Sequence, residues 1–140
     1  MIKIREITPK DYKEIVSLWE RGGMKYDPEG RDSEKMITFQ IEINPGLSLA
    51  AFDGKRMVGV LLGTYDGRRG WLNRLCVDPG YRRKGIATML ITECEKRMLR
   101  RGAKVIAALV EDCNTPSLAL CESLGYVPRR DIIYMRKKID

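Results

Sequence analysis

A chain of 140 residues is long enough for one domain with one hydrophobic core and leaves no room for a second. Hydrophobic residues make up 44% of it and charged residues 32%, which excludes a disordered or fibrous protein. Lysine and arginine outnumber aspartate and glutamate by 26 to 19, and the net charge of +7 favours an anionic partner such as nucleic acid, an acidic protein or a phosphorylated cofactor. Histidine is absent, so serine–histidine and cysteine–histidine mechanisms are excluded.

Cysteine spacing and the apolar runs indicate the environment of the protein. The four cysteines form no Cys-x-x-Cys pair and histidine is absent, so we expect no metal site. An even count allows two disulfides, but without a secretion signal we predict free, mostly buried thiols: Cys76, Cys94, Cys113 and Cys121. Residues 1–7 alternate apolar and charged side chains, which predicts a strand rather than a signal peptide. The longest apolar runs, 57–62 and 105–110, are too short to span a bilayer. We therefore expect a cytoplasmic protein with no membrane partner.

The N-terminal part predicts a helix, a loop and a second helix after the first strand. Thr8-Pro9 is a helix start, and apolar side chains recur with helical spacing over residues 12–19. Gly22-Gly23 ends that helix, and the polar residues up to 32 form a loop. Residues 36–43 fit both a helix and an alternating strand, and we predict a helix.

The central residues predict a three-stranded antiparallel meander. Asp53-Gly54 supplies the positive φ angles of a two-residue turn between strands at 47–52 and 56–65. A second turn at 66–70 leads into a strand at 71–77.

The C-terminal half alternates helices with strands. We predict a helix over 87–98 that stops at Gly102, a strand over 105–110, a helix opened by Thr115-Pro116 and ended by Gly125, and a strand over 131–136. The long helix is a crossover connection, so the strands at 71–77 and 105–110 are expected to be parallel neighbours. The order of elements predicts an α/β protein.

The segment after the third meander strand carries the chemistry. Asp78 opens a sharp turn, and Arg82, Arg83 and Lys84 then place three positive charges before Gly85 at a helix start. The first turn of a helix has unpaired N–H groups and the positive end of the helix dipole, and glycine lets an anion approach the backbone. The segment therefore predicts a cradle for a pyrophosphate, with a charged, solvated helix entry as its alternative.

Two motifs resemble the GNAT acetyltransferase superfamily. Arg82-x-x-Gly85-x-Ala87 resembles that family's acetyl-CoA motif, Gln/Arg-x-x-Gly-x-Gly/Ala. Asn114-x-x-Ser117-x-x-Leu120-Cys-Glu-Ser-Leu-Gly-Tyr126 resembles its Asn-x-x-Ala-x-x-Leu-Tyr-Glu-Lys-x-Gly-Phe segment. The resemblance spans essentially the whole chain and is closest to small members similar to protein N-terminal alanine acetyltransferases. It implies a single GNAT domain over residues 1–140, with a mixed, mostly antiparallel central sheet, a splayed parallel strand pair and about four flanking helices.

The resemblance also implies an acetyl-CoA site. The backbone at Leu75, Cys76 and Val77 would pair with the pantetheine arm like an extra strand, and Asn114 would contact the arm or orient the loop beside it. The splay of the parallel strands would admit the thioester. The pyrophosphate would be held by the basic loop and the first helical turn: Arg82, Arg83, Lys84, Gly85, Ile86, Ala87 and Thr88.

The catalytic residues depart from the family pattern. In the family an amine attacks the thioester directly, a general base takes a proton, and a tyrosine in the Leu-Tyr-Glu segment protonates the leaving thiolate; here that tyrosine is Cys121. A thiol has a reference pKa near ~8.5 against about 10 for a phenol, so Cys121 is the candidate proton donor. Its alternatives are a small buried helix residue and, less favoured, a covalent acetyl carrier. Asn73 and Leu109 stand where relatives carry an acidic base, and the nearby Glu111 and Asp112 are expected to be solvated.

These features predict an enzyme, an acetyl-CoA-dependent N-acetyltransferase that acetylates a primary amine (a protein N-terminus, a lysine or a small amine) by direct attack in a ternary complex. The alternative is a catalytically weak CoA-binding sensor or interaction module, which the missing tyrosine and acid favour. Nucleic-acid binding is not expected, since a pI of 9.4 stands without a recognised motif, and a homodimer is left open. Acceptor recognition is expected from residues 22–32, 66–70 and those after Gly125, with Tyr26, Tyr65 and Trp71 as candidate lining residues.

Overall fold

A computed structural model describes residues 1–139 of the chain. These residues divide into two compact units, the first covering Met1–Leu109 and the second beginning at Val110. The first unit contains a sheet and three helices, and the second contains one helix and the C-terminal segment. Among residues 1–139, no helix combines the length and the apolar run that crossing a bilayer requires.

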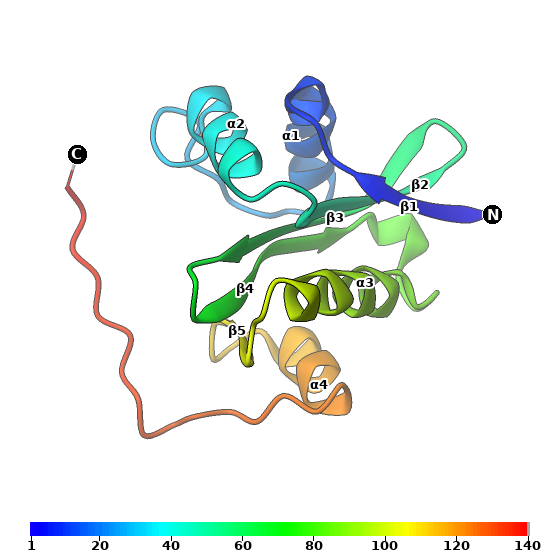
Figure 1. Ribbon diagram of the computed structural model, residues 1–140. Coiled ribbons are helices and arrows are strands. Elements are labelled where there is room, and N and C mark those ends of the chain that lie inside the picture. The colour runs from blue at the N-terminus through cyan, green and yellow to red at the C-terminus, as the bar shows by residue number, and fades with distance from the viewer. Residues whose placement is uncertain (140) are drawn as a thin grey trace. The chain divides into compact units, whose positions relative to one another are not determined.

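Within the described residues, a five-stranded sheet forms the centre of the first unit, with its strands side by side in chain order (Figure 1). Neighbouring strands from β1 to β4 pair antiparallel, and β5 pairs parallel with β4. The predicted mixed sheet, with its meander and its parallel pair, is confirmed. The strands are β1 (Ile2–Glu6), β2 (Ser48–Asp53), β3 (Arg56–Tyr65), β4 (Arg69–Val77) and β5 (Val105–Ala108).

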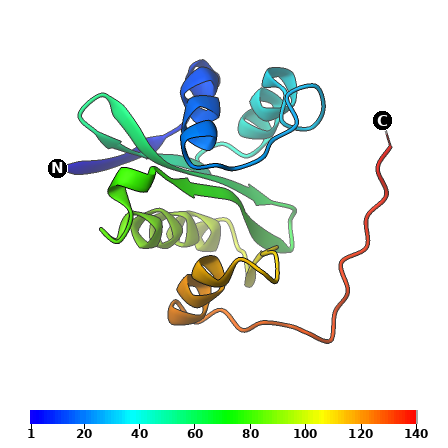
Figure 2. The same ribbon diagram turned by 180° about the vertical axis from the view of Figure 1, so that it is seen from behind.

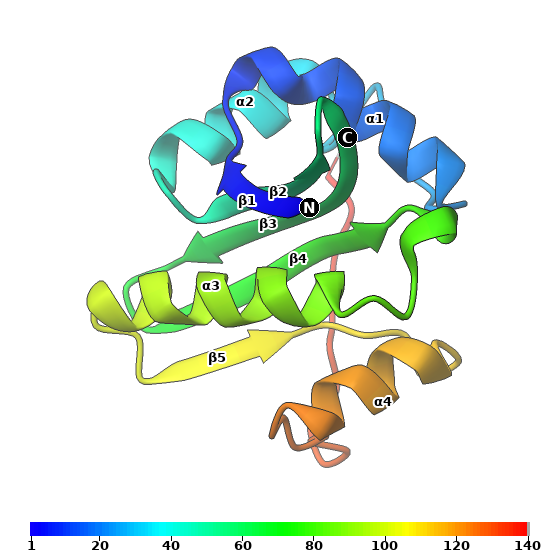
Figure 3. The same cartoon turned by 90° about the vertical axis from the view of Figure 1, so that its right-hand side faces the viewer.

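Three helices cover the two faces of this sheet. Helices α1 (Tyr12–Arg21) and α2 (Glu34–Ile43) lie on one face and α3 (Ile86–Arg100) lies on the other, as Figures 2 and 3 show. A 3₁₀ turn at Pro9–Asp11 precedes α1, and there the Thr8 N–H donates to Asp11 Oδ2 at 2.9 Å. The predicted helix start at Thr8-Pro9 is confirmed.

The ambiguous residues 36–43 are helical. Ser33 Oγ accepts a hydrogen bond from the Met36 N–H at 3.3 Å, which caps α2. Ile37 and Ile41 are buried, whereas Phe39 and Ile43 are more than half exposed. The four alternating apolar side chains are therefore not buried together, as they would be on one face of a strand. The buried pair is four residues apart, which is the spacing of a helix.

Close packing of α3 on the sheet sets the position of its N-terminus. Buried α3 side chains, including Cys94 and Met98, face two glycines of the sheet. A Cβ atom on Gly63 would lie 2.7 Å from Cys94 Sγ, and one on Gly70 would collide with Met98. The missing side chains let α3 approach the strands closely. The same holds at the start of α3, where a Cβ atom on Gly59 would lie 2.9 Å from Ile86 Cγ2.

The second unit contains α4 (Thr115–Ser123) and differs from the prediction in two ways. The N-cap of α4 is Asn114 rather than Thr115, because the Asn114 side-chain oxygen accepts from the Ser117 N–H, three residues further on. The strand predicted over 131–136 is absent from the described residues, and Ile133 and Met135 are more than four-fifths exposed. A strand forms only by pairing, and this segment has no ladder partner within residues 1–139.

Candidate cofactor site and active site

The parallel pairing of β4 with β5 stops halfway along β4. Residues 69–72 pair with β5, and among the described residues no strand pairs with the same edge at residues 73–77. On the other side β3 stays paired as far as Val77, with a one-residue bulge between Asn73 and Cys76. Arg74 in this bulge has a φ of 57°. A bulge bends and twists its strand, so β4 leaves β5 and exposes the backbone edge of Leu75, Cys76 and Val77.

The chain continues from this open edge into a loop of unpaired N–H groups. Arg83 and Gly85 both have positive φ angles, 64° and 78°. The first α-helical hydrogen bond of α3 runs from the Met89 N–H to the Gly85 carbonyl at 3.0 Å. Within residues 1–139, no N–H group of residues 83–88 donates to a protein acceptor. A run of free donors at the positive end of a helix is a site for an anion.

The side chains of this loop reinforce its affinity for an anion. Arg82, Arg83 and Lys84 are exposed, and the Lys84 ammonium lies 5.4 Å from the centre of the Tyr81 ring. Ile86 is buried, which anchors the first turn of α3 in the core, while Ala87 and Thr88 are half-buried. The loop therefore offers backbone donors and three exposed cations next to a helix start that is anchored in the core.

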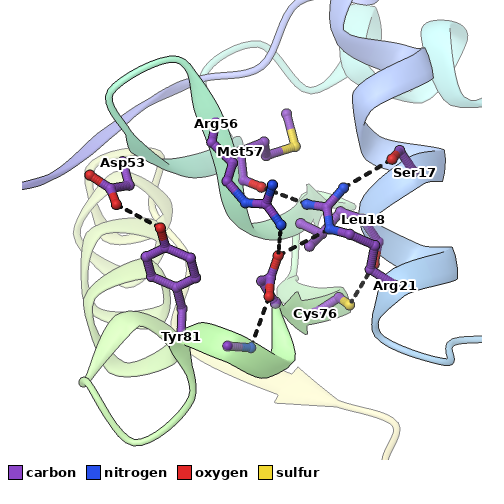
Figure 4. A network of polar contacts seen from close by, with 10 residues as sticks. Ser17, Leu18, Arg21, Asp53, Arg56, Met57, Cys76 and Tyr81 are labelled. Atoms are coloured by element: carbon purple, nitrogen blue, oxygen red, sulfur yellow. Dashed lines mark hydrogen bonds and ion pairs between the residues drawn. The ribbon is translucent and has the colours of Figure 1, made fainter.

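The buried carboxylate of Asp78 joins the start of this loop to the rest of the first unit. Its partners Arg21 and Arg56 are labelled in Figure 4. Asp78 Oδ2 accepts from Arg21 Nε and from one terminal nitrogen of Arg56, each at 3.0 Å, and Asp78 Oδ1 accepts from the Gly80 N–H at 2.9 Å. The Gly80 hydrogen bond, with those of Arg56 and Arg21, holds the pKa of Asp78 below its ordinary value. Asp78 thus joins the end of β4 to α1 and to β3.

Two further contacts complete the anchoring of the loop. Arg21 also donates to the Met57 carbonyl and to Ser17 Oγ, each at 2.9 Å, which fixes its guanidinium. The Tyr81 hydroxyl donates to Asp53 Oδ2 at 2.6 Å, so the 3₁₀ turn at Pro79–Tyr81 is tied to the β2–β3 turn. The geometry of the anion loop therefore depends on residues far from it in the sequence.

The sequence indicated the loop but not its supports. Arg21 lies 57 residues from Asp78, and Arg56 lies 22 residues from it. Neither arginine belongs to a motif or a periodic pattern. Only the position of Asp78, directly before a proline and a basic loop, signalled a constrained turn.

The Cys76 side chain is turned away from the open edge. Its Sγ is buried 3.7 Å from the Leu18 carbonyl of α1, and burial raises the pKa of the thiol. The open edge at this position therefore presents backbone alone, as the predicted pantetheine contact requires.

The structure divides the predicted site residues between the two units. All the predicted cofactor residues except Asn114 lie in the first unit, where the open edge leads directly into the anion loop. Asn114 and Cys121 lie in the second unit. Asn114 Oδ1 accepts from the Ser117 N–H at 3.2 Å, so this side chain caps α4. Cys121 is half-buried, and burial raises its thiol pKa.

No carboxylate occupies the two positions, 73 and 109, where relatives carry the catalytic base. The Asn73 amide donates from Nδ2 to Thr64 Oγ1 at 3.1 Å and to the Trp71 carbonyl at 3.3 Å. Leu109 is exposed, as are Glu111 and Asp112 in the second unit. Neither Asn73 nor Leu109 therefore offers a carboxylate for that role.

A groove of about 410 Å³ lies between α2 and the end of β3. Of the residues expected to line an acceptor cleft, Tyr65 lies in its wall, while Tyr26 donates to Glu20 and Trp71 donates to Asp66. Backbone N–H groups of Arg69 and Arg68 and the Trp71 indole lower the Asp66 pKa to about 2, so this wall carries a fixed negative charge. The groove is lined by Arg31, Met36, Phe39, Gln40, Ile43, Asn44, Thr64, Tyr65 and Asp66.

Sequence similarity to known proteins places the chain in a family. The model of the acetyltransferase (GNAT) family matches residues 9–126. An acetyltransferase of Photorhabdus laumondii is 34% identical over 140 residues, which cover 99% of this chain and 96% of that protein. An acetyltransferase of Sodalis glossinidius is 32% identical over 138 residues, with the same coverage. The chain therefore belongs to the GNAT acetyltransferase family.

A solved structure shows the same fold. The crystal structure of a PaiA N-acetyltransferase from Thermoplasma acidophilum, in complex with coenzyme A, superposes with a TM-score of 0.76. The match covers 89% of each chain at 19% sequence identity.

Proposed function

We propose that this protein is an acetyl-CoA-dependent N-acetyltransferase that acetylates a primary amine by direct attack within a ternary complex. The observation that carries the proposal is the continuity of the open β4 edge with the loop of free N–H groups at the start of α3. Coenzyme A combines a peptide-like pantetheine arm with a pyrophosphate. The open β4 edge suits the arm, and the loop of free N–H groups that follows it in the chain suits the pyrophosphate. Membership of the GNAT family supports the reaction class.

The cofactor would lie along the first unit. The backbone of Leu75, Cys76 and Val77 would pair with the amides of the pantetheine arm as an added strand. The N–H groups of residues 83–88 would bind the pyrophosphate, with the side chains of Arg82, Arg83 and Lys84 around it. Asn114, from the second unit, would contact the arm or fix the loop beside it.

The chemistry would need one proton donor. A neutral amine attacks the thioester carbonyl, a new C–N bond forms, and the C–S bond breaks to release the CoA thiolate. Cys121 would protonate that thiolate, while the proton lost by the amine passes to water. Burial raises the Cys121 pKa, which keeps its thiol protonated at neutral pH and so supports this role.

The test of the cofactor site compares two glycines at opposite ends of α3. Gly85→Ala and Gly102→Ala both place a side chain at a positive φ angle, and neither Cβ meets an atom closer than 3.8 Å. Both should lower the free energy of unfolding by about 1–2 kcal/mol, the cost of a side chain in the left-handed region. We expect Gly85→Ala alone to weaken acetyl-CoA binding, by about tenfold or more, in calorimetric titration. Equal affinities in the two variants would contradict the site.

The test of catalysis measures CoA release with peptides bearing free N-termini, lysine peptides and polyamines. We expect turnover on one class of amine, and we expect Cys121→Ala to lower kcat at unchanged acetyl-CoA affinity, with activity retained in Cys121→Tyr. Unchanged kcat in Cys121→Ala would remove the proton-donor role. Acetyl-CoA binding without turnover on any amine would instead indicate a CoA-binding sensor, the function favoured by the missing tyrosine and acid.

A further inference from the structure

Arg74 has an unusual backbone and an unusual environment for an arginine. Its φ of 57° lies in the left-handed region, where residues with a side chain are rarely found. It occupies the β4 bulge next to the open edge, and its side chain is only 24% exposed. A strained backbone conformation persists only where surrounding contacts hold it. The contacts of the Arg74 side chain therefore indicate its role.

The Arg74 guanidinium joins β4 to the segment between α1 and α2. It lies 4.4 Å from the centre of the Trp19 ring, a cation–π contact with a fully buried side chain. One terminal nitrogen donates to the Lys25 carbonyl at 2.9 Å and lies 3.8 Å from Asp32 Oδ2. The Nε–H group is buried without an acceptor among residues 1–139. The acceptors that hold the guanidinium therefore belong to the segment 24–32.

The segment 24–32, called here the α1–α2 loop, is organised around the same carboxylate. Asp32 Oδ2, which is paired with Arg74, also accepts from the Asp27 N–H at 2.9 Å. The Tyr12 hydroxyl donates to the Asp32 carbonyl at 2.7 Å, and the Met24 N–H donates to the Trp19 carbonyl at 2.9 Å. Asp32 thus closes the loop on itself, and Arg74 connects that closed form to the bulge of β4.

We propose that Arg74 is a positioning residue that couples the order of the α1–α2 loop to occupation of the open β4 edge. The inference rests on the proposed function, in which Leu75, Cys76 and Val77 hold the pantetheine arm. A cofactor that pairs with these residues removes the freedom of the bulge beside them, and the fixed Arg74 then holds Lys25 and Asp32 in the closed loop. Binding of the cofactor thereby fixes the conformation of the α1–α2 loop, which is expected to recognise the acceptor.

Linkage makes this coupling reciprocal. If CoA stabilises the closed loop, the closed loop tightens CoA binding by the same factor. Removing the Arg74 contacts therefore weakens CoA binding although Arg74 itself does not touch the cofactor. The expected factor lies within the ordinary range of such couplings, about five- to 150-fold.

Hydrogen exchange of backbone amides tests the proposal without an acceptor. The proteins are wild type, Arg74→Met, Asp32→Asn and Arg100→Met, each with and without saturating CoA. Methionine keeps an unbranched stem over Trp19, so Arg74→Met is expected to fold, and Asp32→Asn removes the ion pair while an amide oxygen remains for the Asp27 N–H. Arg100 is exposed on the last turn of α3, so Arg100→Met is the matched control for the loss of one arginine charge.

In the wild type and in Arg100→Met, CoA should slow the exchange of the Asp27, Gly30 and Asp32 amides by about tenfold. In Arg74→Met and Asp32→Asn the slowing in the loop should fall below about twofold, while CoA still protects residues 83–88. CoA that protects 83–88 but leaves the wild-type loop unchanged overturns the coupling and leaves the proposed function standing, and so does loop protection retained in Arg74→Met. A wild type that binds no CoA overturns the proposed function and the coupling with it.

Discussion

Substitution of Asp78 by asparagine tests the network that holds the cofactor loop. One carboxylate oxygen accepts from Arg21 and Arg56, and the other accepts from the Gly80 N–H. An asparagine amide has one oxygen and one NH₂ group, so whichever way it turns, an NH₂ group faces an N–H donor. The substitution also removes the negative charge that balances the two arginines.

The magnitude follows from those three bonds. A hydrogen bond to a charged group contributes about 1.5–3 kcal/mol, and a buried donor without an acceptor costs about 1–3 kcal/mol. The Arg21 and Arg56 side chains are 32% and 55% exposed, so water recovers part of the loss. We therefore expect Asp78→Asn to lower the free energy of unfolding by about 2–4 kcal/mol.

Urea denaturation at pH 7 measures the effect, and Asp53→Asn is the matched control. Asp53 lies in the same region (Figure 4), but it accepts from the Tyr81 hydroxyl, and an amide oxygen can still accept that bond. The control should lose less than about 1 kcal/mol. A loss below about 1 kcal/mol for Asp78→Asn, or equal losses in both variants, would refute the reasoning.

The pH dependence of the same comparison has a definite sign. The folded pKa of Asp78 is depressed, so its stabilising contribution is complete above the unfolded carboxyl pKa of about 3.9 and is lost as the pH falls through the folded value. The stability gap between wild type and Asp78→Asn should stay constant from about pH 5 to pH 8 and close below about pH 4. A gap that closes already at pH 6 would assign the effect to another group.

Three further changes test the packing and the thiols. Burial raises the Cys94 pKa to about 12, so about one molecule in ten thousand carries the Cys94 thiolate at pH 8. Iodoacetamide should therefore alkylate the exposed Cys113 in the folded protein and Cys94 only after denaturation, as mass spectrometry would show. Gly63→Ala, whose Cβ would meet Cys94 Sγ and the Leu47 carbonyl, should lower the free energy of unfolding by about 2–3 kcal/mol in urea titration. Ile37→Asp should cost more than about 3 kcal/mol, and Phe39→Asp less than about 1 kcal/mol, because only Ile37 is buried; similar losses in the two would contradict the assigned face of α2.

The anion loop is the part of the candidate site that could be predicted best. Gly85 and the basic residues before it act through their own φ angles, N–H groups and charges, which are properties of a short stretch of chain. The open β4 edge was expected only from the family resemblance, because the sequence of β4 does not show where pairing with β5 stops. The roles of Arg21, Arg56 and Arg74 could not be predicted, since each acts on a partner from another element.

The sequence by itself determined the elements whose causes are local. Helix caps, a glycine turn after β2 and the apolar period of α3 depend on residues at most a few positions apart. The turn itself is Gly54-Lys55 rather than the predicted Asp53-Gly54, because Asp53 pairs with Arg56 as the last residue of β2 and only Gly54 has a positive φ angle. Only the tertiary structure decided that residues 36–43 form a helix, because burial of Ile37 and Ile41 selects one of two compatible periods. It also decided that residues 131–136 form no strand, because a strand exists only where another chain segment offers its edge. The contacts of Asp78 and Arg74 join residues distant in the chain, and their partners are chosen by the packing of helices on the sheet rather than by any neighbouring residue.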